Sequence, residues 1–204
     1  NNRILSKISK KYKNLKLIKK NFLDLNEKDL NILCELNFKK NYGIFVNLIG
    51  YVDNNSFEKT SFDSLINSIK VNSIIPMIIL KKILGKMIVK KYGRILNCSS
   101  IGVKFGGGKN SFNYSYSKHA SEFIPSSIKR LAKKNILINN IRIGVTDTKI
   151  HKNLKNQSEI KKIISLIPTK KIANKIEIAN YLYFLISEEN SYMTNETITV
   201  AGGE

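Results

Sequence analysis

The sequence predicts an α/β fold, a doubly wound parallel sheet of the Rossmann-like type. Short apolar runs alternate along the chain with segments of helical periodicity, and the runs are compact enough for strands that are buried on both faces. Strands that alternate with helices at this spacing imply parallel βαβ units. No internal repeat or low-complexity linker interrupts the pattern, so we predict a single domain over residues 1–204.

The first half of the chain contains the following predicted elements. Residues 3–13 place apolar side chains at a helical period on a lysine-rich background. Residues 15–25 are predicted to form a strand that ends at Asp24, and Asn26 is a typical cap for a helix that begins at Glu27. Further along we expect a buried strand over 44–49, a helix from about residue 61 and a second helix from about 72 to 91.

The second half alternates in the same way. We expect a strand over 94–98, a Gly-rich loop over 102–110 and then a helix that carries Tyr114 and Lys118. These are followed by a strand over 136–143, helices over 157–166 and 175–187, and a last strand over 197–200. Pro125 falls inside the presumed Tyr114 helix, where it would kink the helix or remove a hydrogen bond. Open α/β sheets bind ligands at the carboxyl ends of their strands. The polar residues that fall there are Asp24, Asn47, Ser99, Ser100 and those of the turn after Ile143.

The composition narrows the classes of function. No apolar run approaches the ~20 residues that a membrane-spanning helix needs, and the N-terminus has no apolar signal core, so we expect a cytoplasmic protein with no membrane partner. Cys34 and Cys98 fit reduced core thiols, and two histidines are too few for a histidine-rich metal centre. The net charge of +20 comes from lysines spread through nearly every segment, which indicates a compositional bias and no specific nucleic-acid partner. An acidic carrier protein or a phosphorylated substrate would also suit this charge, and nucleic-acid binding stays an alternative.

The segment Tyr114-Ser-Tyr116-Ser-Lys118 is the strongest local indication of chemistry. Residues four apart lie on one face of a helix, so Tyr114 is the partner of Lys118 and Tyr116 is not. At about 4 Å and an effective dielectric constant near 20, the ammonium would favour the phenolate by about 4 kcal/mol, or roughly 3 pKa units. We therefore expect a lowered pKa for Tyr114, which would make it a usable acid or base near neutral pH.

Further motifs surround this pair in a fixed order. They are Ile44-Phe-Val-Asn47-Leu-Ile-Gly50, Asn72, Gly93-Arg-Ile-Leu-Asn-Cys-Ser99-Ser100, Asn140-Ile-Arg-Ile-Gly144-Val-Thr-Asp-Thr148 and Glu196-Thr-Ile-Thr-Val-Ala-Gly202-Gly203. Together with the Tyr114 and Lys118 pair, they resemble the short-chain dehydrogenase/reductase family, especially its 3-oxoacyl-carrier-protein-reductase-like branch. The resemblance covers essentially the whole chain.

The resemblance implies an NAD- or NADP-dependent oxidoreductase that interconverts a carbonyl and a secondary alcohol. Tyr114 would be the general acid or base, Lys118 would lower its pKa and bind the nicotinamide ribose, and Ser100 would bind the reacting oxygen. Asn72 would interrupt its helix and bind a water that links Lys118 to solvent. The implied cofactor-binding residues are Asp24, Leu25, Asn47, Gly50, Tyr114, Lys118, Gly144, Thr146 and Thr148. The resemblance also implies a small-molecule substrate, free or bound to a carrier protein, and assembly as a homotetramer or homodimer.

The chain departs from the family pattern at its start. Family members open with a strand, a Gly-rich turn that binds the pyrophosphate, a helix and a second strand. The sequence begins at what would be the following helix, so we expect it to represent a longer polypeptide only in part. The loop 102–110 does not replace the turn, because a phosphate loop would need Gly at Val103 and Ser or Thr at Asn110. The alternative function is therefore a catalytically silent family member that binds a partner.

Overall fold

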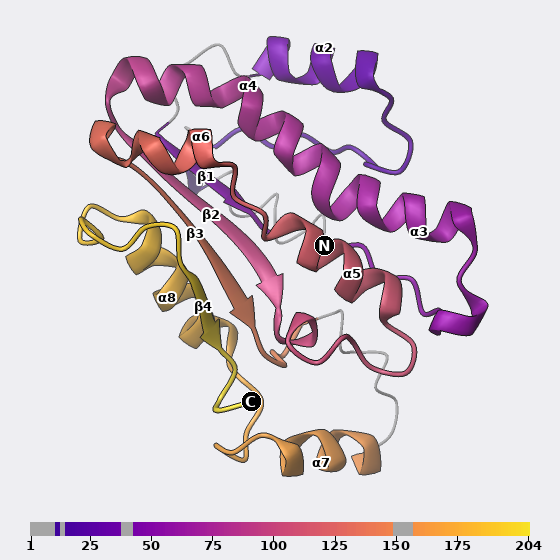
Figure 1. The fold of residues 1–204 in the computed structure, drawn as a ribbon. Coiled ribbons are helices and arrows are strands. Elements are labelled where there is room, and N and C mark those ends of the chain that lie inside the picture. The colour runs from indigo at the N-terminus through magenta and orange to yellow at the C-terminus, as the bar shows by residue number, and fades with distance from the viewer. Residues whose placement is uncertain (1–10, 13–14, 38–42, 149–156) are drawn as a thin grey trace.

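In the part of the chain that the structure describes, the centre is a four-stranded parallel sheet (Figure 1). The computed structural model describes residues 11–12, 15–37, 43–148 and 157–204. The strands lie in the order β1-β2-β3-β4, with bounds Ile44–Asn47, Gly93–Ser100, Ile136–Ile143 and Thr197–Val200. Every neighbouring pair of these strands is parallel. The doubly wound, Rossmann-like class that the sequence predicted is confirmed.

Helices cover both faces of this sheet (Figure 1). One face carries α4, α5 and α6, whose bounds are Ile75–Lys90, Phe112–Ser121 and Ser126–Lys129, and α3 (Phe62–Ile69) packs beside α5. The other face carries α8, Lys175–Ile186. Helix α2 (Glu27–Asn37) packs on α4, and α7 (Gln157–Leu166) lies beyond the carboxyl ends of the strands (Figure 1).

The apolar sequences of β2 and β3 explain why these strands lie at the centre. Successive side chains of a strand point to opposite faces of the sheet, so a strand covered on both faces needs apolar residues at odd and even positions. Ile95 and Ile138 are buried beneath α4 and α6. Leu96 and Ile141, both 0% exposed, pack on the other face against Leu185 of α8.

The helices predicted from about residues 61 and 72 form one continuous helical run. Ser61 caps α3 by accepting a hydrogen bond from the backbone N–H of Ser64 at 3.2 Å. A π-helical turn, Lys70–Ile74, joins α3 to α4 and contains Asn72. Such turns insert one extra residue into a helix and are frequent at functional sites. The interruption implied at Asn72 is therefore present.

The strand predicted over 15–25 is wrong. The described part of this segment is irregular, and Leu15, Leu17 and Ile18 are each more than 40% exposed. A strand needs a neighbouring strand to pair with, and among the described residues β1 has β2 as its only neighbour in the sheet. Without a partner, the alternating apolar pattern of this segment does not form a strand.

Smaller corrections concern the ends of elements. Helix α5 ends at Ser121, so Pro125 lies beyond it and precedes α6, where its missing N–H breaks no helical hydrogen bond. The strand predicted over 44–49 ends at Asn47, and Ile44 is 46% exposed because β1 lies at the edge of the described sheet. The helix predicted over 3–13 falls outside the described residues, apart from positions 11 and 12.

Both cysteines are buried free thiols, as the composition suggested. In the described ranges, no helix is long and apolar enough to cross a bilayer. The same ranges contain no group of three or more His, Cys, Asp or Glu side chains that could bind a metal ion. The cytoplasmic location stays a prediction.

Two positions on α4 allow a test of the core. Met87 is 0% exposed and lies in the cluster between α4 and the sheet, whereas Val89, two residues later, is 79% exposed. We expect Met87→Ala to lower the free energy of unfolding by about 2–5 kcal/mol, because it removes buried atoms and leaves a cavity. Val89→Ala should change it by less than about 0.5 kcal/mol. Chemical denaturation measures both; equal losses would contradict the described packing.

Candidate active site

A cavity of about 410 Å³ lies where β1, β2 and β3 end. Its wall includes Gly50 after β1, Ser100 at the end of β2 and Gly144 just after β3. Helix α5 contributes Tyr114 and Lys118, and α8 contributes an apolar side. The volume falls within the range of about 300–1,000 Å³ that is usual for small-molecule sites, and the position follows the rule for open α/β sheets.

Lys118 is buried, and two backbone carbonyls bind its ammonium. The side chain is 3% exposed, and Nζ donates hydrogen bonds to the carbonyl oxygens of Ile49 at 2.6 Å and Cys98 at 2.7 Å. Burial lowers the pKa of Lys118 from 10.5 to about 8. An ammonium has three N–H donors, so one remains for a group in the cavity.

Tyr114 lies one helical turn before Lys118, as the spacing predicted. The centroid of its ring is 5.9 Å from Lys118 Nζ. Burial raises the pKa of Tyr114 above its ordinary value of 10.0, and a hydrogen bond with the Ser100 side chain opposes the rise. The lowered pKa predicted from the spacing is therefore wrong for the protein alone, because burial outweighs the hydrogen bond with Ser100.

Asn72 connects the turn after β1 to helix α5. Its side chain is 0% exposed, its Oδ1 accepts from the backbone N–H of Tyr51 at 2.7 Å, and its Nδ2 donates to the Tyr51 carbonyl at 2.8 Å. Nδ2 also donates to Ser117 Oγ at 2.8 Å, and that hydroxyl donates to the carbonyl of Tyr114 at 2.8 Å. Asn72 therefore fixes both elements that surround Lys118. Its part in a water relay stays a prediction.

The structure separates the predicted cofactor residues into two groups. Those that line the cavity are Gly50, Tyr114, Lys118, Gly144, Thr146 and Thr148. Asn47 is 2% exposed and lies below the cavity, where its amide donates to Asn97 Oδ1 at 2.7 Å and accepts from the N–H of Ile49 at 3.1 Å. Asn47 thus orders the turn that carries the Ile49 carbonyl.

Asp24 and Leu25 do not line this cavity. The exposed Asp24 carboxylate accepts a hydrogen bond from Asn21 Nδ2 at 2.8 Å. Leu25 is buried against α2 and α4, in a cluster with Leu30 and Ile75. Their contact with a cofactor stays a prediction.

Sequence reasoning missed the apolar side of the cavity. Leu48, Ile143 and three residues of α8 line it, and Lys175 stands at the start of that helix; the α8 residues are Ile178, Ala179 and Leu182. The spacing of these three residues indicates one face of a helix. It does not show that this face covers the ends of β2 and β3, which depends on the fold.

Comparisons with known proteins agree with this fold. A family model described as Enoyl-(Acyl carrier protein) reductase matches residues 18–204. The chain is 36% identical over 196 residues to a 3-oxoacyl-(acyl-carrier-protein) reductase FabG from Buchnera aphidicola subsp. Schizaphis graminum, covering 92% of this chain and 80% of that protein. It is 34% identical over 187 residues to the reductase of the same name from Aquifex aeolicus, covering 86% and 74%.

Solved structures show the same fold. A putative NAD(P) dependent gluconate 5-dehydrogenase from Beutenbergia cavernae, with bound NADP at low occupancy, superposes with a TM-score of 0.87 at 23% identity, covering 98% of this chain and 81% of that one. The fold and the matches define an NAD(P)-dependent oxidoreductase class. The chain belongs to the short-chain dehydrogenase/reductase family, in its 3-oxoacyl-carrier-protein-reductase-like branch, as the motifs indicated.

The buried ammonium predicts a pH dependence of stability. Since the pKa of Lys118 is about 8 in the folded chain and 10.5 ordinarily, the unfolded chain binds more protons between these values, and the contribution of Lys118 to stability rises with pH. We expect the unfolding free energy of the wild type, minus that of Lys118→Met, to rise by about 2 kcal/mol from roughly pH 7.5 to 9.5. Denaturation at several pH values measures it.

Lys81→Met, at an exposed position on α4, controls for the loss of one positive charge. A difference between the wild type and Lys118→Met that stays flat across this pH range would contradict the described burial of Lys118.

Proposed function

We propose that the protein reduces a carbonyl group to a secondary alcohol with NADH or NADPH, and that it catalyses the reverse oxidation when the reactants favour it. The presence of Lys118, Tyr114 and Ser100 together in the lining of the cavity carries this proposal. A phenol that is hydrogen-bonded to a serine, one turn from a buried ammonium, has the groups needed to move a proton and to stabilise charge on an oxygen.

The cavity fits the nicotinamide half of the cofactor. Ser99 Oγ is buried in its wall without a hydrogen-bond partner among the described residues, which supports a polar ligand there. Gly50 presents backbone without a side chain, so a flat ring can approach closely there. At Gly144 a Cβ would instead lie 2.6 Å from Ala201 Cα, so the glycine allows the turn after β3 to pack against Ala201. We propose that Lys118 donates its free N–H to a ribose hydroxyl and that Thr148 binds the carboxamide.

The proposed chemistry divides between the cofactor and the chain. When bound, the reduced nicotinamide supplies a hydride, which carries two electrons to the carbonyl carbon. Tyr114 donates its hydroxyl proton to the carbonyl oxygen, and Ser100 donates a hydrogen bond to the same oxygen, which becomes the alcohol. Lys118 stabilises the remaining phenolate, which regains a proton from solvent before the next turnover.

We propose a 3-oxoacyl thioester on an acidic carrier protein as the substrate. The names of the relatives support this class, and so does that of an acetoacetyl-CoA reductase from an Acinetobacter species, 32% identical over 162 residues. Leu48, Ile143 and Leu182 offer an apolar wall for an acyl chain, and Lys175 adds a positive charge at the cavity. The net charge of +20 would attract an acidic carrier. Assembly as a homodimer or homotetramer rests on the resemblance.

A catalytically silent binding protein is the second candidate. The raised pKa of Tyr114 favours it, because a phenol that gives up its proton less readily is a weaker acid in the reduction. A silent member that has kept its cavity would still bind the reduced cofactor but would not oxidise it.

Two tyrosines on α5 form a matched pair for the test. We expect Tyr114→Phe to lower kcat for reduction of an acetoacetyl thioester by roughly 100- to 10,000-fold, because it removes the proton donor. Tyr116 is 50% exposed and does not line the cavity, so Tyr116→Phe should keep kcat within about two-fold of wild type. The absorbance of the reduced nicotinamide measures turnover, and its fluorescence measures binding.

Both variants should bind the cofactor largely as the wild type does, because Lys118 and Thr148, which we propose bind the ribose and the carboxamide, are unchanged. Full activity of Tyr114→Phe would overturn the mechanism. Binding without turnover in the wild type, with both NADH and NADPH, would support the silent protein instead.

A further inference from the structure

One side chain from each strand lies in a single row across the sheet, on the face that carries α5. The row consists of Asn47, Asn97, Asn140 and Thr197, and each is the register partner of the next. We call these four residues the amide ladder. Asn47 and Asn140 are each 2% exposed, so their amides lie in the interior, where an unpaired polar group is costly.

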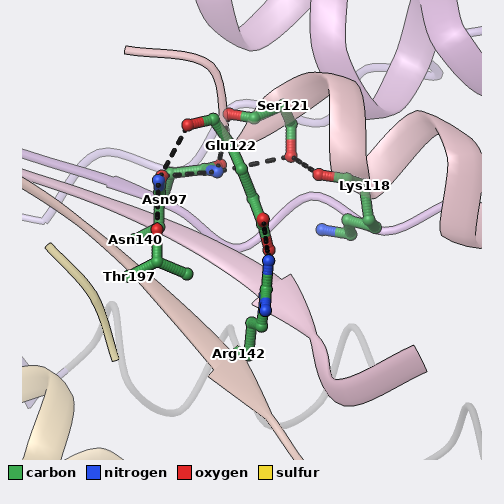
Figure 2. Close-up of polar contacts among 7 residues, drawn as sticks. All are labelled: Asn97, Lys118, Ser121, Glu122, Asn140, Arg142 and Thr197. Atoms are coloured by element: carbon green, nitrogen blue, oxygen red, sulfur yellow. Dashed lines mark hydrogen bonds and ion pairs between the residues drawn. The ribbon is translucent and has the colours of Figure 1, made fainter. Parts of the chain in front are cut away.

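The amide ladder is a continuous chain of hydrogen bonds that runs in one direction. Asn47 Nδ2 donates to Asn97 Oδ1 at 2.7 Å, and Asn97 Nδ2 donates to Asn140 Oδ1 at 3.2 Å. Asn140 Nδ2 then donates to Thr197 Oγ1 at 3.1 Å (Figure 2). A shift of one strand by a single residue would turn one amide to the opposite face of the sheet and break the chain.

The same amides bind the carboxyl end of α5. Asn97 Nδ2 also donates to the carbonyl of Ser121 at 2.9 Å, and Asn140 Nδ2 donates to the carbonyl of Glu122 at 2.8 Å. Ser121 Oγ donates to the carbonyl of Lys118 at 2.7 Å (Figure 2). The last carbonyls of a helix lack partners within the helix, so these bonds satisfy groups that would otherwise be unpaired.

An ion pair adds a second connection between β3 and the end of α5. Arg142 lies two residues after Asn140 and binds both carboxylate oxygens of Glu122, at 2.8 and 2.6 Å (Figure 2). Paired, two-point contacts of this kind restrict orientation as well as distance. The end of α5 is therefore fixed to β2 by Asn97 and to β3 by Asn140 and Arg142.

This attachment lies next to the proposed proton-transfer pair. Lys118 Nζ donates to the carbonyl of Cys98, the residue after Asn97 on β2. The amide ladder fixes the position of α5 on the sheet. That position also determines whether Lys118 Nζ reaches the carbonyl of Cys98. If the proposed function is correct, an α5 displaced along the sheet would move Lys118 and Tyr114 together.

We infer that Asn97 and Asn140 are positioning residues, which fix α5 on the sheet so that Tyr114 and Lys118 lie at the cavity in the geometry that proton transfer needs. This inference rests on the proposed function for its effect on catalysis. Its structural part, the attachment of α5, is independent of any reaction.

Asn139 provides a matched control. It is 1% exposed and neighbours Asn140 on β3, yet it binds the segment before β4, through the carbonyl of Met193 at 2.9 Å and the N–H of Glu196 at 3.1 Å. Leucine at position 97 or 139 removes comparable buried hydrogen bonds while keeping the number and branching of the side-chain heavy atoms. Only Asn97→Leu leaves the Ser121 carbonyl at the end of α5 without its amide.

Hydrogen–deuterium exchange and steady-state kinetics of Asn97→Leu and Asn139→Leu test the inference. We expect Asn97→Leu to speed amide exchange in peptides covering 114–122 by roughly ten-fold or more, and Asn139→Leu to do so only near 190–197. Asn97→Leu should lower kcat by roughly 10- to 100-fold, because a displacement of about 1 Å at the reacting groups has an effect of this size. Asn139→Leu should keep kcat within about two-fold of wild type at a temperature where it is folded.

Equal effects of the two variants on α5 exchange, or unchanged exchange in Asn97→Leu, would overturn the inference. If Asn97→Leu does not fold, Asn97→Ala removes the same amide donor without adding atoms: faster exchange over 114–122 supports the inference, and unchanged exchange overturns it. A wild type without turnover would refute the proposed function, whereas the exchange data would still decide whether the ladder fixes α5.

Discussion

The buried ammonium of Lys118 is the constraint on which the rest of the site depends. A buried charge is costly unless other groups bind it, and here the carbonyls of Ile49 and Cys98 do so. One carbonyl follows β1 and the other belongs to β2, so the two strands and α5 must meet at one point. Asn72 fixes the turn after β1, and Asn97 fixes the end of α5.

This constraint also explains the electrostatics of the pair. Burial lowers the pKa of Lys118 to about 8 and raises that of Tyr114, so both groups shift toward their neutral forms. In the protein alone the pair is therefore a phenol beside an amine that titrates slightly above neutral pH. The hydrogen bond from Ser100 acts in the direction that catalysis needs, since it opposes the rise in the pKa of Tyr114.

Elements with a complete local pattern could be predicted from the sequence. The continuous apolar run at Ile136–Ile143 forms a central strand, and Asn26 caps α2 by accepting from the N–H of Asp29 at 2.8 Å. The segment 15–25 has a strand-like pattern but no partner strand among the described residues. Local periodicity does not show whether a partner strand exists, so that prediction failed.

The residues of the site could be predicted from the sequence, but the direction of the pKa shift of Tyr114 could not. The spacing of Tyr114 and Lys118 gave the right neighbours, but the direction of the Tyr114 pKa shift depends on burial, which arises from the packing of α5 on β2. The amide ladder had no signal in the sequence, because asparagines are frequent throughout the chain and only the strand register brings Asn97 and Asn140 together.

The proposed function requires that oxidation of the cofactor be coupled to reduction of a carbonyl. The decisive measurement is the ratio of reduced nicotinamide consumed to secondary alcohol formed when the purified protein is incubated with NADPH, or with NADH, and an acetoacetyl thioester. We expect one 3-hydroxybutyryl thioester for each nicotinamide oxidised. Bound cofactor that is never oxidised, with no alcohol formed at any pH near neutrality, would contradict the proposed function.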